Sequence, residues 1–271
     1  MNAFFSIMAV PFAACVLMFL ILNYMGIHVL MREIIFIDIA LAQISAVGAL
    51  VSMLVFKHNP AIAEALAFGF CLLAAAFFSF VRKKNFGISM ETIIGVSYAI
   101  AAAAALFLIS KSAQGHTSAE HMFAGSILWA TSRDLTMSLV IFSACAAFFY
   151  IFRKKFLETS SRYKESVSTD FWNDFLFYSL FAAVITLSVK MGGVLLVFAF
   201  LIIPAVVASL FYGGIQKRLI VSWAVSLIAS ATGLLFSYCF DFSIGPSIVA
   251  FLGLILIIAS LRARAAKKTC S

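Results

Sequence analysis

The chain has 271 residues, of which 64% are hydrophobic and only 11% are charged, and its mean hydropathy is +1.12. This composition lies far outside the range of soluble proteins and predicts an all-α, polytopic membrane protein without a sizeable soluble domain. Basic residues beside membrane spans, together with anionic lipid headgroups, account for the net charge of +8. The charge therefore does not indicate a nucleic acid partner.

Apolar runs near the ~20 residues that cross a bilayer as a helix recur along the whole chain. They cover residues 3–25, 34–56, 61–81, 92–110, 134–152, 174–190, 191–212, 218–239 and 246–262. We therefore expect one transmembrane domain over residues 1–271 with eight to nine spans. The run 191–212 is the least regular, because Gly192, Gly193 and Pro204 allow a broken or partly re-entrant element.

The distribution of basic residues predicts the orientation, because Lys and Arg beside spans are retained on the cytoplasmic side. With nine crossings and the C-terminus inside, only four of the 19 Lys and Arg residues fall outside. These four are Lys57, Lys111, Arg133 and Lys190. We therefore expect the N-terminus outside and the C-terminus in the cytoplasm.

The second run contains an ionisable residue, Asp38, and an amide, Gln43. A carboxylate in hydrocarbon costs several kcal/mol, so intramembrane acids usually line a polar pathway, pair with a partner or bind a cation. At 100° per residue, one small and polar stripe of this helix comprises Asp38, Ala42, Ser45, Ala49 and Ser52. The stripe suits a cation path or close helix packing, and Asp38 alternatively pairs with Arg32.

Two loops carry further candidates. The outer loop 111–133 contains His116, Glu120 and His121, which are possible metal donors if the segment is helical, although histidines in external loops are usually only solvated. The inner loop 153–173 is long enough for a short surface helix. It either docks a partner or serves the topology as a solvated basic loop.

The end of the eighth run places Asp241 at the outer side, before Gly245 and Pro246. Asp241 is a candidate entry ligand for a cation, and the alternative is a turn or cap residue, because Asp favours turns. Glu91 opens the fourth run, where we expect an N-terminal cap.

The sequence lacks the motifs of several enzyme classes. It has no G-x-x-x-x-G-K-[ST] phosphate loop, no H-E-x-x-H and no G-x-S-x-G, and its five cysteines show no C-x-x-C pair. Transport without an intrinsic cofactor is therefore the expected function, and ATP, if used, must be hydrolysed by another subunit.

Five stretches together resemble the permease subunits of bacterial ABC importers for manganese, zinc and iron, over residues 26–262. They are Phe36–Gly48 (FIDIALAQISAVG), Glu91–Gly95 (ETIIG), Gly125–Leu128 (GSIL), Lys190–Ala208 (KMGGVLLVFAFLIIPAVVA) and Gly233–Gly245 (GLLFSYCFDFSIG). The block that begins at Lys190 is the most specific of them. The resemblance implies a bacterial cytoplasmic membrane, a homodimer, two ATP-hydrolysing subunits, an extracytoplasmic metal-binding protein and a divalent zinc, manganese or iron ion as cargo.

The resemblance also implies a coupling region at residues 204–218 that contacts the ATPase. Its candidate residues are Pro204, Ala205, Gly213, Gly214, Lys217 and Arg218. The alternative for this region is a span that is merely kinked by proline. The inner loop 153–173 is the competing docking segment.

The second run departs from the commonest pattern of the family, in which an Asp is followed four residues later by a His. Here Gln43 follows Asp38 by five residues, so on a straight helix it points about 140° away, and an amide is a poor ligand for these cations. Zinc is the first expectation, because three potential donors lie in the outer loop. A secondary carrier using Asp38 and Asp241, and a permease for a metal chelate or a non-metal substrate, are the alternative functions.

Overall fold

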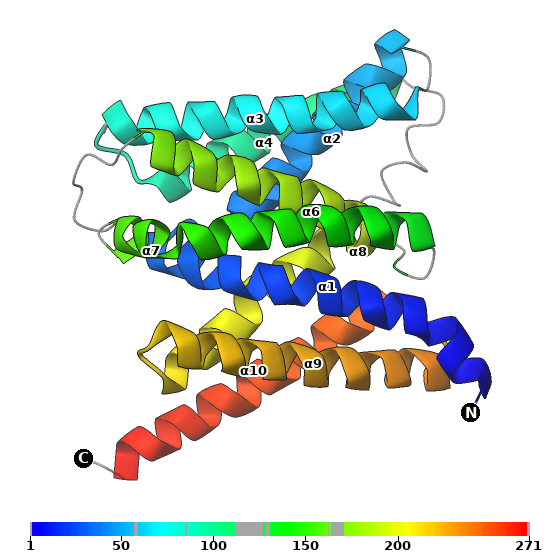
Figure 1. Ribbon diagram of the computed structural model, residues 1–271, viewed down its shortest axis with the longest axis vertical. Coiled ribbons are helices and arrows are strands. Elements are labelled where there is room, and N and C mark those ends of the chain that lie inside the picture. The colour runs from blue at the N-terminus through cyan, green and yellow to red at the C-terminus, as the bar shows by residue number, and fades with distance from the viewer. Residues whose placement is uncertain are drawn as a thin grey trace. The chain divides into compact units, whose positions relative to one another are not determined.

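The computed structural model describes residues 2–56, 59–84, 86–111, 127, 131–161, 163 and 171–269, and within them every regular element is helical (Figure 1). The helices are α1 (Asn2–Arg32), α2 (Ile37–Phe56), α3 (Pro60–Lys84), α4 (Met90–Lys111), α6 (Ser132–Ile151), α7 (Arg153–Ser161), α8 (Phe171–Phe211), α9 (Ile215–Phe240) and α10 (Ile244–Thr269). Eight of them, all but α7, are long and apolar enough to cross a membrane. A helix suits this environment because it satisfies its own backbone hydrogen bonds in lipid.

Helix α8 explains why eight helices provide nine segments of membrane length. Its 41 residues would extend for about 60 Å, twice the ~30 Å thickness of the hydrocarbon core. Gly193 interrupts it with φ 78° and ψ 163°, a backbone conformation that glycine adopts without steric cost. The pieces on either side, 171–192 and 194–211, each have the length of one span. The break falls close to the predicted boundary between runs 174–190 and 191–212, and Pro204 lies within the second piece.

One compact unit combines Met1–Leu30, Ala124–Phe142 and Lys190–Ser271. Within it, α1 approaches the second piece of α8 so closely that a Cβ atom on Gly26 would lie 1.9 Å from the carbonyl oxygen of Leu201. Helices α9 and α10 pack against one another, and Figure 1 shows α10, coloured orange to red, crossing α9. The unit is thus held by close helix contacts at small residues, as is usual in membrane proteins.

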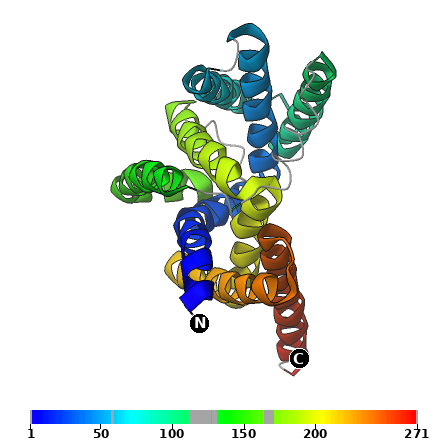
Figure 2. The same cartoon turned by 90° about the vertical axis from the view of Figure 1, so that its right-hand side faces the viewer.

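The other unit combines Met31–Phe123 and Ser143–Val189. Its α2 packs against both α3 and α4, and Figure 2 shows α2 flanked by these two helices. Aromatic side chains fill the space near α7, where Phe156 lies 5.1 Å from Phe149 and 6.1 Å from Phe177 between ring centroids. Neither unit is contiguous in sequence, because the chain passes between them several times.

Two boundaries differ from the sequence prediction. The first helix continues to Arg32, and the chain then turns at Glu33, whose φ is 55°. Helix α2 consequently begins at Ile37 rather than at residue 34, so Asp38 lies in its first turn and not one turn deeper. The short surface helix expected in the loop 153–173 is present as α7.

Candidate transport site

Asp38 is buried in the first turn of α2, with 2% of its surface exposed. Neither of its carboxylate oxygens has a hydrogen-bond partner among the described residues. The polar groups beside it are the backbone N–H groups of Asp38 and Ile39, at the positive end of the helix dipole. A carboxylate in this setting is left to take up a proton or a cation, because an unpaired buried charge costs several kcal/mol.

Glu91 brings a second carboxyl group near Asp38, close enough for the two groups to interact electrostatically. It lies in the first turn of α4, and its Oε1 accepts a hydrogen bond from the backbone N–H of Phe36 at 3.3 Å. Its Oε2 is buried and has no hydrogen-bond partner in the described part of the chain. The expected capping role belongs instead to Ser89, whose Oγ accepts a hydrogen bond from the N–H of Thr92. Glu91 thus fixes the segment that leads into α2.

Arg32 does not pair with Asp38, which was the alternative that the sequence offered. Its guanidinium forms a buried ion pair with Asp174, with 3.0 Å between Nη1 and Oδ1, and it donates from Nε to Ser160 Oγ at 2.9 Å. The ring of Phe177 lies 3.8 Å below the guanidinium carbon. Arg32 is therefore engaged at the junction of α7 and α8, and Asp38 keeps no basic partner there.

Tyr163 belongs to the same cluster as Arg32 and Asp174, because the guanidinium carbon of Arg32 lies 5.3 Å from the centroid of its ring. Arg82 lies 3.7 Å over its ring and donates a hydrogen bond to its backbone carbonyl. The hydroxyl groups of Tyr163 and Tyr178 are 2.8 Å apart. Burial raises the pKa of the Tyr163 phenol, so this hydroxyl stays protonated at neutral pH. The cluster ties the inner loop to the ends of α3 and α8.

Gln43 is buried as well, with 5% of its surface exposed, but it follows Asp38 by five residues on the same helix. On a regular helix it therefore projects from a different side. The polar members of the predicted stripe, Asp38, Ser45 and Ser52, are all buried, and Ser52 Oγ has no hydrogen-bond partner among the described residues. The polar positions of the stripe thus lie inside the protein.

The residues of the predicted coupling region fall into two groups. Pro204 and Ala205 are buried inside the second piece of α8, and the carbonyl of Pro204 accepts a hydrogen bond from Ser222 at 3.1 Å. Gly213, Gly214 and Lys217 are exposed in the turn before α9 and in its first turn. Arg218 is half-buried, and its Nε donates to the carbonyl of Tyr212 at 2.7 Å, which shapes the turn. Only the turn offers a surface.

The outer candidates lie apart from Asp38 in the sequence and are of two kinds. Asp241 is exposed and ends α9 in the left-handed conformation, with φ 56° and its N–H bonded to Ser237, which is the cap role considered for it. His116, Glu120 and His121 lie outside the described residues. In the part of the chain that is described, no group of three or more His, Cys, Asp or Glu side chains is arranged to hold a metal ion.

Sequence reasoning missed the cluster around Arg32 and Asp174. Both residues flank apolar runs, where charges usually serve the topology, and they are separated by 142 positions without any shared pattern. The available signal was an acid at the start of a long apolar run, a position favourable to the helix dipole.

Comparison with known proteins gives a consistent result over most of the chain. The model of the ABC 3 transport family matches residues 4–263. The manganese transport system membrane protein MntC of Listeria innocua is 30% identical over 195 residues, which cover 71% of this chain and 69% of that protein. The chelated iron transport system membrane protein YfeD of Yersinia pestis is 27% identical over 194 residues, which cover 70% of this chain and 63% of that protein.

A solved structure has the same fold. PsaBC from Streptococcus pneumoniae, in complex with a Fab, contains a chain that superposes with a TM-score of 0.75. The match covers 96% of this chain and 95% of that chain at 22% sequence identity.

Proposed function

The chain belongs to the ABC 3 transport family as a membrane permease subunit and not an enzyme, and we propose that it conducts a divalent transition metal ion into a bacterial cell. The observation that carries the proposal is Asp38, a buried carboxylate whose two oxygens have no hydrogen-bond partner among the described residues. A cation in transit supplies the countercharge that this group lacks.

The cargo is manganese or iron. Relatives that match over most of this chain are named for manganese and for chelated iron. Carboxylate oxygens, which Asp38 and Glu91 supply, suit Mn²⁺ and Fe²⁺, whereas zinc sites favour His and Cys ligands. The expectation of zinc as the cargo rested only on the outer-loop residues His116, Glu120 and His121, which lie outside the described part of the chain.

The path for the ion runs past few ligands. Asp241 and the outer-loop donors are the entry candidates, and Asp38 is the ligand within the membrane region. Gln43 acts as a packing and hydrogen-bonding group beside the path, because its offset from Asp38 prevents the two from gripping one ion on a straight helix. A path whose described residues form no complete ligand set releases the ion quickly.

Energy comes from partner proteins. The permease works as a homodimer with two ATP-hydrolysing subunits on the inner side and a metal-binding protein on the outer side. The coupling contact is the exposed turn that includes Gly213, Gly214 and Lys217, while Pro204 and Ala205 support it from within α8. This arrangement has the N-terminus outside and the C-terminus in the cytoplasm of a bacterial inner membrane.

Reconstitution tests this function. The permease is placed in liposomes with and without its ATPase, and uptake of radioactive manganese, iron and zinc is measured with ATP present inside or absent. We expect uptake of manganese or iron only with both the ATPase and ATP. Uptake by the permease alone, driven by an ion gradient, would identify a secondary carrier instead, and uptake of only a chelated metal would identify a chelate permease.

A further inference from the structure

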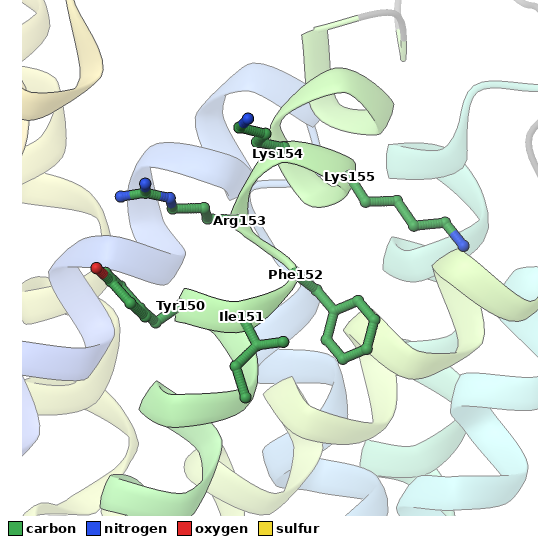
Figure 3. Close-up of a pocket in the computed structure, with 6 residues that line it drawn as sticks. All are labelled: Tyr150, Ile151, Phe152, Arg153, Lys154 and Lys155. Carbon is green, nitrogen blue, oxygen red and sulfur yellow. The ribbon is translucent and has the colours of Figure 1, made fainter.

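A shallow cavity lies where α6 ends and α7 begins, and we propose that it binds the phosphate headgroup of an anionic phospholipid. Six consecutive residues line this cavity, and we call these six residues the α6–α7 junction. They are Tyr150, Ile151, Phe152, Arg153, Lys154 and Lys155 (Figure 3). The cavity volume is about 420 Å³.

The junction changes from apolar to basic within these six residues. Tyr150 and Ile151, at the end of the membrane span, are 69% and 71% exposed, and Phe152 is 40% exposed. Three cationic side chains follow directly, and all of them are exposed. An apolar surface beside a cluster of cations at the end of a span matches a lipid, whose acyl chains adjoin an anionic headgroup.

The side chains of the junction extend from the chain in different directions. Figure 3 shows Tyr150 and Arg153 extending to one side and Phe152 and Lys155 to the other. The guanidinium carbon of Arg153 lies 4.9 Å from the centroid of the Tyr150 ring, a cation–π contact that orients the arginine. Phe152 lies 4.6 Å from the ring of Phe148 on the preceding turn.

Helix α7 is held firmly, so the basic residues are presented in a fixed place. Phe156 is 4% exposed and packs against Phe149 and Phe177. Ser160, at the far end of α7, is buried and accepts the hydrogen bond from Arg32. A headgroup meets a surface whose backbone is already ordered, which lowers the entropy cost of binding.

The charge of the junction excludes the transported ion as its ligand. None of the described residues that line the cavity is a carboxylate, and three adjacent cations repel a divalent metal. The site is therefore separate from the metal path and does not depend on the identity of the cargo.

Native mass spectrometry of the full chain in detergent tests the proposal, with phosphatidylglycerol and phosphatidylcholine of equal chain length as probes. We expect phosphatidylglycerol to bind the wild-type protein at least tenfold more tightly than phosphatidylcholine. The Lys154→Gln/Lys155→Gln variant should lose roughly tenfold in affinity for phosphatidylglycerol, and the corresponding double substitution to arginine should retain it.

The matched control is Lys83→Gln/Lys84→Gln, which removes two exposed lysines at the end of α3 that do not line the cavity. This control should lose less than twofold. Equal losses in both glutamine variants, or no preference for the anionic lipid, would overturn the proposal. Displacement of the lipid by millimolar inorganic phosphate would overturn it in favour of a free anion. Intact lipid binding together with lost ATPase assembly in the junction variant would assign the surface to the protein partner.

Discussion

Arg32 and Asp174 form an ion pair from which water is excluded: the Nη1–Oδ1 distance is 3.0 Å, and the side chains are 0% and 1% exposed. The pair joins the end of α1 to the first turn of α8. It also removes the basic residue nearest to Asp38 in the sequence from any role as its partner. Among the described residues, Asp174 is thus a buried acid with a basic partner, whereas neither oxygen of Asp38 has a hydrogen-bond partner.

The paired acid predicts a strong effect on stability. Asp174→Leu leaves the Arg32 guanidinium buried without its countercharge. Arg32→Met likewise leaves the Asp174 carboxylate buried without its countercharge. Each single variant should lose about 3–5 kcal/mol of stability. The double variant should be close to the wild type, because an apolar pair of similar volume carries no desolvation penalty.

Thermal unfolding of the purified variants in detergent measures these differences. The control is Lys190→Met, which breaks the exposed Lys190–Asp134 pair, 3.5 Å long with side chains 51% and 28% exposed. It should cost less than about 1 kcal/mol. Additive losses in the double variant would show that the two residues do not interact.

The contact between α1 and α8 predicts a steric effect at Gly26. A Cβ atom there would lie 1.9 Å from the carbonyl oxygen of Leu201, which belongs to the backbone and has little room to move. Gly26→Ala should therefore lower the stability by about 1–3 kcal/mol or more. Gly95→Ala is the control, because nothing lies within 4 Å of its added Cβ, and this variant should melt at or above the wild-type temperature. Equal melting of both variants would refute the close approach.

The break at Gly193 predicts an odd number of crossings, which cysteine labelling tests. In a cysteine-free background, single cysteines are placed at Ser89, Gly213 and Phe242, all of which are exposed. With nine crossings and the N-terminus outside, an impermeant maleimide added to whole cells should label only position 242. Labelling of both 89 and 213 from outside, with 242 protected, would contradict the orientation. Labelling of 213 but not of 89 from outside would contradict the two crossings of α8.

The exposed turn before α9 predicts where the ATPase binds. Phe211, at the end of α8, is 46% exposed, and Lys217, in the first turn of α9, is exposed as well. Phe211→Ala combined with Lys217→Gln should weaken copurification of the ATPase at least tenfold, because aromatic residues are enriched at protein interfaces. Lys84→Gln, at the end of α3, should leave copurification unchanged. An unaffected ATPase in the first variant would transfer the docking role to the inner loop 153–173.

Much of the fold could be predicted from the sequence, because membrane spans leave a local signal. Apolar runs of the right length gave the helices, and the glycine pair 192–193 marked the break in α8. The start of α2 was misplaced because Ile34, Ile35 and Phe36 are apolar although the chain turns there. Hydropathy measures composition and does not detect a turn built from apolar residues.

The site was only partly predictable. Asp38 was identified because an acid inside an apolar run is rare. That it has no hydrogen-bond partner among the described residues, and that Glu91 lies near it, depend on how α2 and α4 pack, which no local pattern encodes. The contacts of Tyr163 could not be predicted for the same reason, because Arg82 and Tyr178, which contact it, come from distant segments.

The most direct test of the account is manganese or iron uptake by the Asp38→Asn variant, reconstituted with its ATPase. Asn keeps the size of the side chain but not its charge, so uptake should fall at least tenfold. The melting temperature should stay the same or rise, because a neutral group costs less to bury than an unpaired carboxylate. Full uptake by Asp38→Asn would contradict the account, since the ion would then cross without this carboxylate.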